Sequence, residues 1–171
     1  MTENSVYRGF LSSKLEFSAE TTPKFDHVQT FKITFSRDFA SVQIIGNVLS
    51  GYLSTVEELI LEWREGSLNW LSHIQWAGFF NHSRRVKKVQ VPSELAHSVA
   101  HSLNPGGLLL LPNLEQVKVQ MTHPPKIGPS SDHHYEYIRD IFKPLISARQ
   151  QVGRAIILSF FVGMSQIGDT A

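Results

Sequence analysis

Two histidines four residues apart form the pattern that comes closest to a metal or catalytic site. His97 and His101 would lie on one face of a helix, at a spacing that occurs in zinc sites. The residues between them are Ser, Val and Ala, so the pair lacks the glutamate base of the metalloprotease motif. Leu95, Val99 and Leu103 form an apolar stripe on the opposite side of the same segment. We therefore interpret the pair as solvated and keep a histidine-dependent metal-binding enzyme as the alternative.

A second group of histidines falls in a proline-rich segment. His123, His133 and His134 accompany Asp132 in a stretch that also holds three prolines and a glycine. We expect residues 122–134 to form a flexible surface loop, because this composition supports neither a helix nor a central strand. A flexible loop holds tetrahedral ligand geometry poorly, so we predict no metal ligand and no cofactor.

Other reactive groups are missing or have structural explanations. The chain has no cysteine, which excludes disulfides, thiolate metal ligands and thiol nucleophiles. It has no G-x-S-x-G motif, and Gly106-Gly107 lacks the lysine of a phosphate-binding loop. We expect no catalytic residue and no enzyme activity. Trp63, Trp70 and Trp76 lie among apolar residues and are predicted to be core, with a carbohydrate-binding protein as the alternative.

Charge and hydropathy argue against nucleic acid and membrane partners. The formal net charge of +1 gives no broad basic field for phosphates. The basic run at 84–88 resembles a nuclear signal or a phosphate contact, but Val86 and Val89 fit a strand whose charges are solvated. The N-terminus lacks the apolar segment of a secretory signal, and the apolar run at 155–164 is shorter than the ~20 residues of a membrane span. We expect an intracellular protein, cytoplasmic or nuclear.

A six-residue phrase, apolar-x-x-apolar-x-apolar, occurs four times and sets the expected fold. The copies begin at Val28, Val56, Val86 and Leu114, at intervals of 28, 30 and 28 residues. A near-constant period of this size is typical of a leucine-rich-repeat array. Helical spacing follows the first three copies, over 41–53, 71–80 and 93–103, the last with Ser93 as N-cap. We predict an α/β fold, a short irregular leucine-rich-repeat-like solenoid with a parallel sheet of about four to six strands backed by helices.

The segments at the two ends are less regular than the repeats. We expect one irregular strand over 11–17, because terminal units must cap the core. Helical spacing resumes over 135–151, where Pro144 should bend or interrupt the helix, and a last strand is predicted over 155–160. The expected parts are an irregular cap at 1–24, a repeat domain at 25–160 and a C-terminal tail at 161–171.

Strand alternation divides each phrase between two faces of the sheet. The last two apolar positions of each copy should point into the core: Phe31, Ile33, Leu59, Leu61, Val89, Val91, Val117 and Val119. The residues around them should form one open face, with an acidic strand between basic ones: Lys32, Thr34, Glu58, Ile60, Glu62, Lys88, Gln90, Gln116 and Lys118. We predict that this face binds a protein partner, because repeat solenoids commonly bind through their open sheet, and the alternative is a solvated face without a partner.

Three stretches carry a family resemblance: Leu53-Ser-Thr-Val-Glu-Glu-Leu-Ile-Leu, Leu111-Pro-Asn-Leu-Glu-Gln-Val and Ala148-Arg-Gln-Gln-Val-Gly-Arg. With their surroundings, over about 25 to 160, they resemble the C-terminal leucine-rich-repeat-like region of fungal F-box proteins. The resemblance implies a substrate receptor of a ubiquitin ligase, whose repeats hold a protein target while the F-box docks on a Skp-type adaptor. Residues 1–27 hold no F-box opening, so we expect target binding and no adaptor binding from this chain. The target is not identified by the sequence.

Overall fold

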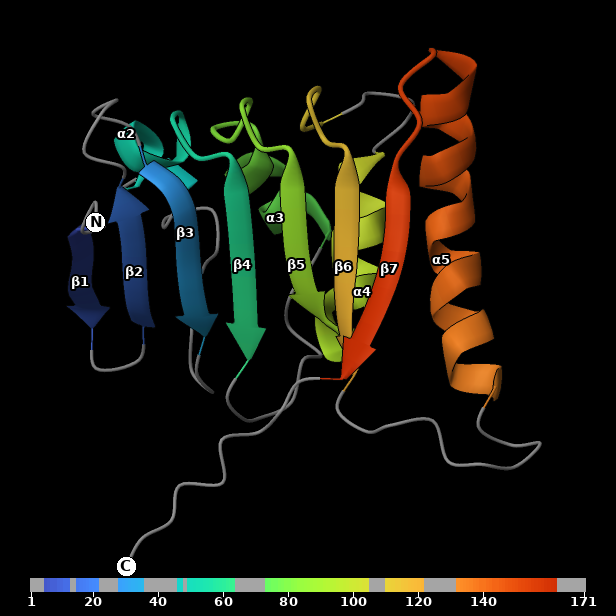
Figure 1. Cartoon of the computed structure of the whole chain (residues 1–171), viewed down its shortest axis with the longest axis horizontal. Helices are drawn as coiled ribbons and strands as arrows, with labels where there is room; N and C mark the ends of the chain where they lie inside the picture. The colour runs from blue at the N-terminus through green and yellow to red at the C-terminus, as the bar shows by residue number, and fades with distance from the viewer. Residues whose placement is uncertain are drawn as a thin grey trace, which may run out of the picture.

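The centre of the fold is one seven-stranded sheet whose strands follow one another in chain order (Figure 1). The computed structural model describes residues 5–12, 15–21, 28–35, 46–47, 49–63, 73–104, 110–121 and 132–162. The strands are β1 (Ser5–Ser12), β2 (Leu15–Thr21), β3 (Val28–Phe35), β4 (Glu58–Trp63), β5 (Lys88–Pro92), β6 (Gln116–Met121) and β7 (Ile157–Val162). Each repeated phrase thus contributes one strand, and the strands adjacent in sequence are adjacent in space.

The strand directions divide the sheet into two parts. β1 pairs with β2 and β2 pairs with β3 in antiparallel fashion, whereas β3 to β7 are all parallel. The parallel registers are in phase with the sequence repeat, since Thr30, Glu58, Lys88, Gln116 and Ile157 form one row across the five strands. The chain is therefore an α/β protein with a five-stranded parallel sheet.

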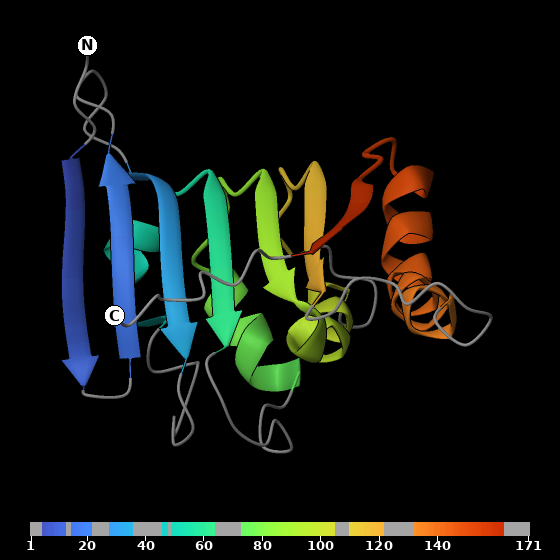
Figure 2. The ribbon, with the colours of Figure 1, turned by 60° about the horizontal axis from the view of Figure 1, so that its bottom comes forward.

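The helices back one face of this sheet. Their bounds are α2 (Ser50–Leu53), α3 (His73–Phe80), α4 (Ser93–Leu103) and α5 (Asp132–Gln151). Figure 1 shows α2, α3 and α4 behind the strands and α5 beside β7, and Figure 2 shows the same layer from below. No helix in the described ranges is long and apolar enough to cross a membrane.

The core lies between the sheet and the helices. All eight residues predicted to point inward from the repeated phrases have no exposed surface, which confirms the predicted alternation. From the helix side, Trp76 packs edge to face on Phe35 and Phe79 and stacks on Phe80, at ring-centroid distances of 5.5, 5.9 and 5.8 Å. The prediction that Trp76 is core is confirmed. Trp63 is partly buried against the core, and Trp70 lies outside the described residues.

The N-terminal part differs from the prediction. The single irregular strand expected over 11–17 is wrong, since β1 and β2 are two strands that form an antiparallel hairpin around positions 13 and 14. The reason is that Ser13-Lys14 lacks the glycine, asparagine or proline that marks most tight turns, so the reversal has no signal in the sequence. The N-terminal strands thus extend the sheet in antiparallel fashion, with a register shift in each of their two pairings.

The C-terminal helix also begins and continues differently from the prediction. α5 starts at Asp132, inside the expected loop 122–134. Positions 122–131 lie outside the described residues. The helix runs through Pro144 without interruption. A proline costs about 3 kcal/mol in a helix, and burial of Phe142 and Leu145 on either side, about 1.5 to 3 kcal/mol each, offsets it.

Two smaller predictions at element ends were wrong. The last strand spans Ile157–Val162 and not 155–160, so it takes in the first two positions of the expected tail. The N-cap of α4 is Pro92, which has an extended backbone and makes no side-chain cap hydrogen bond, and Ser93 is the first helical residue. The Ser93 hydroxyl instead donates to the carboxylate of Glu94 at 3.1 Å.

Candidate functional site

The candidate site is the sheet face turned away from the helices, called here the open face. The strand registers bring all nine predicted binding residues onto it: Lys32, Thr34, Glu58, Ile60, Glu62, Lys88, Gln90, Gln116 and Lys118. β7 extends the same rows with Ile157 beside Gln116 and Ser159 beside Lys118. Most of these side chains are partly exposed, although Thr34 is buried. The sequence therefore predicted which residues share this face but missed the contribution of β7.

Ion pairs connect the strands across the open face. The ammonium of Lys32 on β3 lies 2.8 Å from Oε1 of Glu62 on β4, whose Oε2 accepts a hydrogen bond of 3.2 Å from the hydroxyl of Thr34. Lys118 on β6 reaches over β5 to Oε1 of Glu58 at 3.6 Å. The acidic strand β4 is therefore neutralised from both sides. Within the described part of the chain, Lys88 forms no ion pair and is exposed at the start of β5, the middle strand of the parallel array.

The rim at the beginning of the strands is also polar. A groove of about 460 Å³ is lined by Thr30, Glu57, Glu58, Lys87, Lys88 and Glu115. The Glu57 carboxylate forms ion pairs with Lys87 at 3.3 Å and with Arg85 at 3.9 Å. The buried side chains of Val86 and Val89 alternate with these exposed or partly exposed charges, which confirms that the basic run at 84–88 is the solvated entrance of a strand.

Main-chain hydrogen bonds repeat along this rim. The carbonyl of Glu57 accepts from the N–H groups of Lys87 and Lys88, and the carbonyl of Lys87 accepts from those of Glu115 and Gln116, at 2.7 to 3.1 Å. Between the starts of β6 and β7 one such bond is found among the described residues: the carbonyl of Glu115 accepts from the N–H of Ile157 at 2.9 Å. This ladder fixes the starting point of each parallel strand and therefore keeps the rows of the open face in register.

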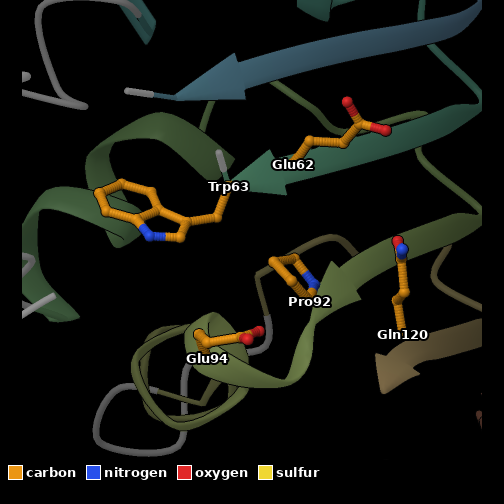
Figure 3. Close-up of a pocket in the computed structure, with 5 residues that line it drawn as sticks. All are labelled: Glu62, Trp63, Pro92, Glu94 and Gln120. Atoms are coloured by element: carbon orange, nitrogen blue, oxygen red, sulfur yellow. The ribbon is translucent and has the colours of Figure 1, made fainter. Parts of the chain in front are cut away.

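A pocket of about 230 Å³ lies at the other rim, where the strands end, and is called here the rim pocket. Its lining residues are Glu62, Trp63, Pro92, Glu94 and Gln120 (Figure 3). The pairing of β4 with β5 stops at Ile60 and Gln90, whereas β3 still pairs with Trp63 and β6 still pairs with Pro92. β4 and β5 therefore part at their ends, beside a proline that has no N–H to donate.

The histidines predicted as alternatives do not join either rim. His97 and His101 are both exposed on α4 with ring centroids 4.6 Å apart. His133 and His134 are exposed at the start of α5, and His133 lies 4.0 Å from Glu136. In the part of the chain that the structure describes, no three histidine, cysteine or acidic side chains lie close enough to share a metal ion. His123 lies outside that part.

Arg149 is the structural residue that sequence reasoning missed. Its guanidinium is fully buried and donates to three carbonyls of the segment before β6, those of Leu110, Leu111 and Leu114, at 2.6, 2.7 and 3.2 Å. Burial, together with the charge of Arg154, lowers the pKa of Arg149 from its ordinary value. In the sequence, Arg149 stood out only as part of the stretch Ala148-Arg-Gln-Gln-Val-Gly-Arg that carries the family resemblance. The resemblance assigned no role to this arginine. Its function is to hold the loop that leads into the open face.

Comparisons of the chain with protein-family models, with curated proteins and with solved structures each found no match, so its function is inferred from the geometry of the open face and its two rims.

Proposed function

We propose that this chain is a non-enzymatic protein-interaction module that binds a protein partner across its open face. The observation that carries the proposal is a parallel sheet whose described helices all lie on one side. Parallel sheets are normally covered on both faces, because the crossover helices fall on both sides. A parallel sheet that keeps one polar, ordered face uncovered is typical of repeat proteins that bind through that face.

The dimensions of the open face suit a protein partner. Seven strands about 4.8 Å apart and roughly six residues long give a face of roughly 600 Å². A standard protein interface buries about 800 Å² on each partner. A partner must therefore cover nearly the whole face and at least one rim, which is a larger footprint than a small molecule requires.

We further propose that the chain is a leucine-rich-repeat-like solenoid that serves as the target-binding region of an F-box-type ubiquitin-ligase receptor. The in-phase registers of β3 to β6 and the rim ladder support the repeat character. The ligase role rests on the sequence resemblance alone. It predicts that the open face holds a target protein and that this chain does not bind a Skp-type adaptor.

The test is to reverse the charge pattern of the open face while keeping its ion pairs. The double variant Glu58→Lys with Lys118→Glu exchanges two partners that lie 3.6 Å apart. Partly exposed ion pairs contribute about 0 to 1 kcal/mol, so the free energy of unfolding should change by about 1 kcal/mol or less. Capture of a specific partner from lysate, measured by affinity purification with mass spectrometry, should fall at least about tenfold, because juxtaposed like charges oppose binding.

A matched control exchanges charges away from the open face. Asp140 and Lys143 form an exposed ion pair of 2.6 Å on α5, so the variant Asp140→Lys with Lys143→Asp should leave capture unchanged. The proposal is wrong if the captured proteins are the same for the wild type and the open-face exchange. If the open-face exchange loses both partner capture and the circular dichroism signal of the folded protein, the capture experiment would be repeated with Lys88→Glu. That variant breaks no described ion pair.

A further inference from the structure

The rim pocket has the chemistry of a site for one cationic side chain. Two of its lining residues are glutamates from different elements, Glu62 at the end of β4 and Glu94 in the first turn of α4. The other lining residues are Trp63, Pro92 and Gln120, whose side chains Figure 3 shows. No basic side chain is found among its described lining residues. An indole face and carboxylate oxygens are the groups that recognise ammonium and guanidinium ions in proteins.

The two carboxylates of the rim pocket differ in the hydrogen-bond and ion-pair partners that they already have. The Glu62 carboxylate is turned toward β3, as Figure 3 shows, where it already binds Lys32 and Thr34. Glu94 is exposed, and its one described partner is the neutral hydroxyl of Ser93 at 3.1 Å. Glu94 therefore has oxygen lone pairs available for an incoming cation, whereas Glu62 adds a negative charge that Lys32 partly neutralises.

The volume of the rim pocket limits the size of the ligand that it can bind. Sites for small molecules and cofactors usually enclose about 300 to 1,000 Å³. The rim pocket, at about 230 Å³, falls below that range. It therefore suits a single side chain rather than a whole cofactor. Figure 3 places Trp63 and Glu94 on one side of Pro92 and Gln120 on the other, so a side chain over Pro92 would have the indole and a carboxylate beside it.

The N-terminus of α4 argues for the opposite charge, but the lining outweighs it. A helix N-terminus attracts anions because its first N–H groups are unpaired. In this chain the acidic Glu94 already occupies the first turn. A phosphate entering the rim pocket would therefore meet two carboxylates and no basic side chain among the described lining residues.

We infer that the rim pocket binds an arginine or lysine side chain that the protein partner inserts at the end of β4 and β5. This inference rests on the proposed function, because the pocket opens beside Glu62 and Gln120 on the open face. It names the chemistry that one part of the partner must carry. A partner lying along the strands would present this basic residue at the rim where β4 and β5 part.

The experiment titrates the full chain with Nα-acetyl-arginine amide and Nα-acetyl-lysine amide and follows the indole N–H signal of Trp63 by nuclear magnetic resonance. The Trp63→Phe variant assigns that signal. We expect a saturable shift in the millimolar range with at least one of the two cations, and none with Nα-acetyl-citrulline amide, which is a neutral analogue of arginine. Glu94→Gln should weaken binding about three- to tenfold, whereas Glu136→Gln, on the exposed side of α5, should not.

Several outcomes would overturn the inference: no saturable shift with either cation, an equal shift with citrulline, unchanged affinity in Glu94→Gln, or a larger shift with inorganic phosphate. The result is separable from the test of the open face. If the exchange of Glu58 and Lys118 abolishes partner capture and Glu94→Gln does not alter it, the proposed function stands and the rim-pocket inference fails. If capture survives both changes, the proposed function fails.

Discussion

A buried arginine that has no carboxylate partner among the described residues is the unusual feature of this fold. Charged side chains are rarely fully buried unless they are paired, since removing a charge from water is costly. Arg149 compensates with hydrogen bonds to main-chain carbonyls. One of those carbonyls belongs to Leu111, which has a φ of 53°, a conformation that costs a non-glycine residue about 1 to 2 kcal/mol. The guanidinium thus stabilises a strained segment that lies between α4 and β6, outside the described helices and strands.

Replacement of Arg149 by methionine should destabilise the protein by about 3 to 5 kcal/mol, because it leaves buried carbonyls without donors. Arg149→Lys should cost less, since an ammonium keeps the charge but loses the planar fork that reaches several carbonyls. Urea denaturation measures both values. Arg139→Met, at an exposed position of the same helix, is the control and should change stability by less than about 0.5 kcal/mol. Equal effects at the two positions would contradict this account of Arg149.

At the scale of the element, the C-terminal end of α5 fixes the positions of both Arg149 and the start of β7. The N–H of Arg154 donates to the carbonyl of Arg149 at 2.8 Å, and the N–H of Gly153 donates to that of Gln150 at 3.0 Å. These two bonds form a Schellman motif, which requires a residue with positive φ, and Gly153 has a φ of 72°. The helix therefore stops at a fixed position and the chain turns directly into the last strand.

Gly153→Ala should lower the free energy of unfolding by about 1 to 2 kcal/mol. Open space surrounds the site of the new methyl group, so the cost comes from the backbone conformation and not from a clash. Gly51→Ala is the matched control, because it also enters open space but lies in α2, where alanine is favoured by about 0.5 to 1 kcal/mol. Thermal unfolding should separate the two variants in opposite directions. A stabilised Gly153→Ala would refute the capping role.

At the scale of the whole molecule, the sequence predicted the repeated elements well and their exceptions poorly. The alternation of Val117 and Val119 with polar neighbours is a local property, so burial and face followed from it. The parting of β4 and β5 at Pro92 depends on how two strands 30 residues apart diverge, and spacing along the chain does not encode that. The hairpin of β1 and β2 was missed because its turn lacks the usual residues, and Arg149 because its partners are backbone atoms about 35 to 39 positions away.

The β1–β2 hairpin should keep the molecule monomeric by covering the edge of the parallel array. β2 pairs with β3 over seven residue pairs. Deletion of residues 1–21 would expose the main chain of β3, and exposed strand edges promote self-association. Size-exclusion chromatography with light scattering should then show dimers or larger species. Deletion of residues 1–14 should remain monomeric, because β2 still covers β3 and carries Glu16 and Glu20, charges that discourage edge pairing. Monomers in both cases would show that the hairpin has no such role.

The bonds of Arg149 also have a consequence for protein synthesis. A ribosome releases the chain from its N-terminus, so the segment from Leu110 to Leu114 emerges well before its hydrogen-bond donor, which follows Leu110 by 39 residues. β3, β4 and β5 have all their neighbours available by the time β6 is made, but the loop that leads into β6 lacks its donor until α5 has been translated. Nascent chains that end before Arg149 should therefore expose this loop to proteases and chaperones, and those that extend past Arg154 should protect it.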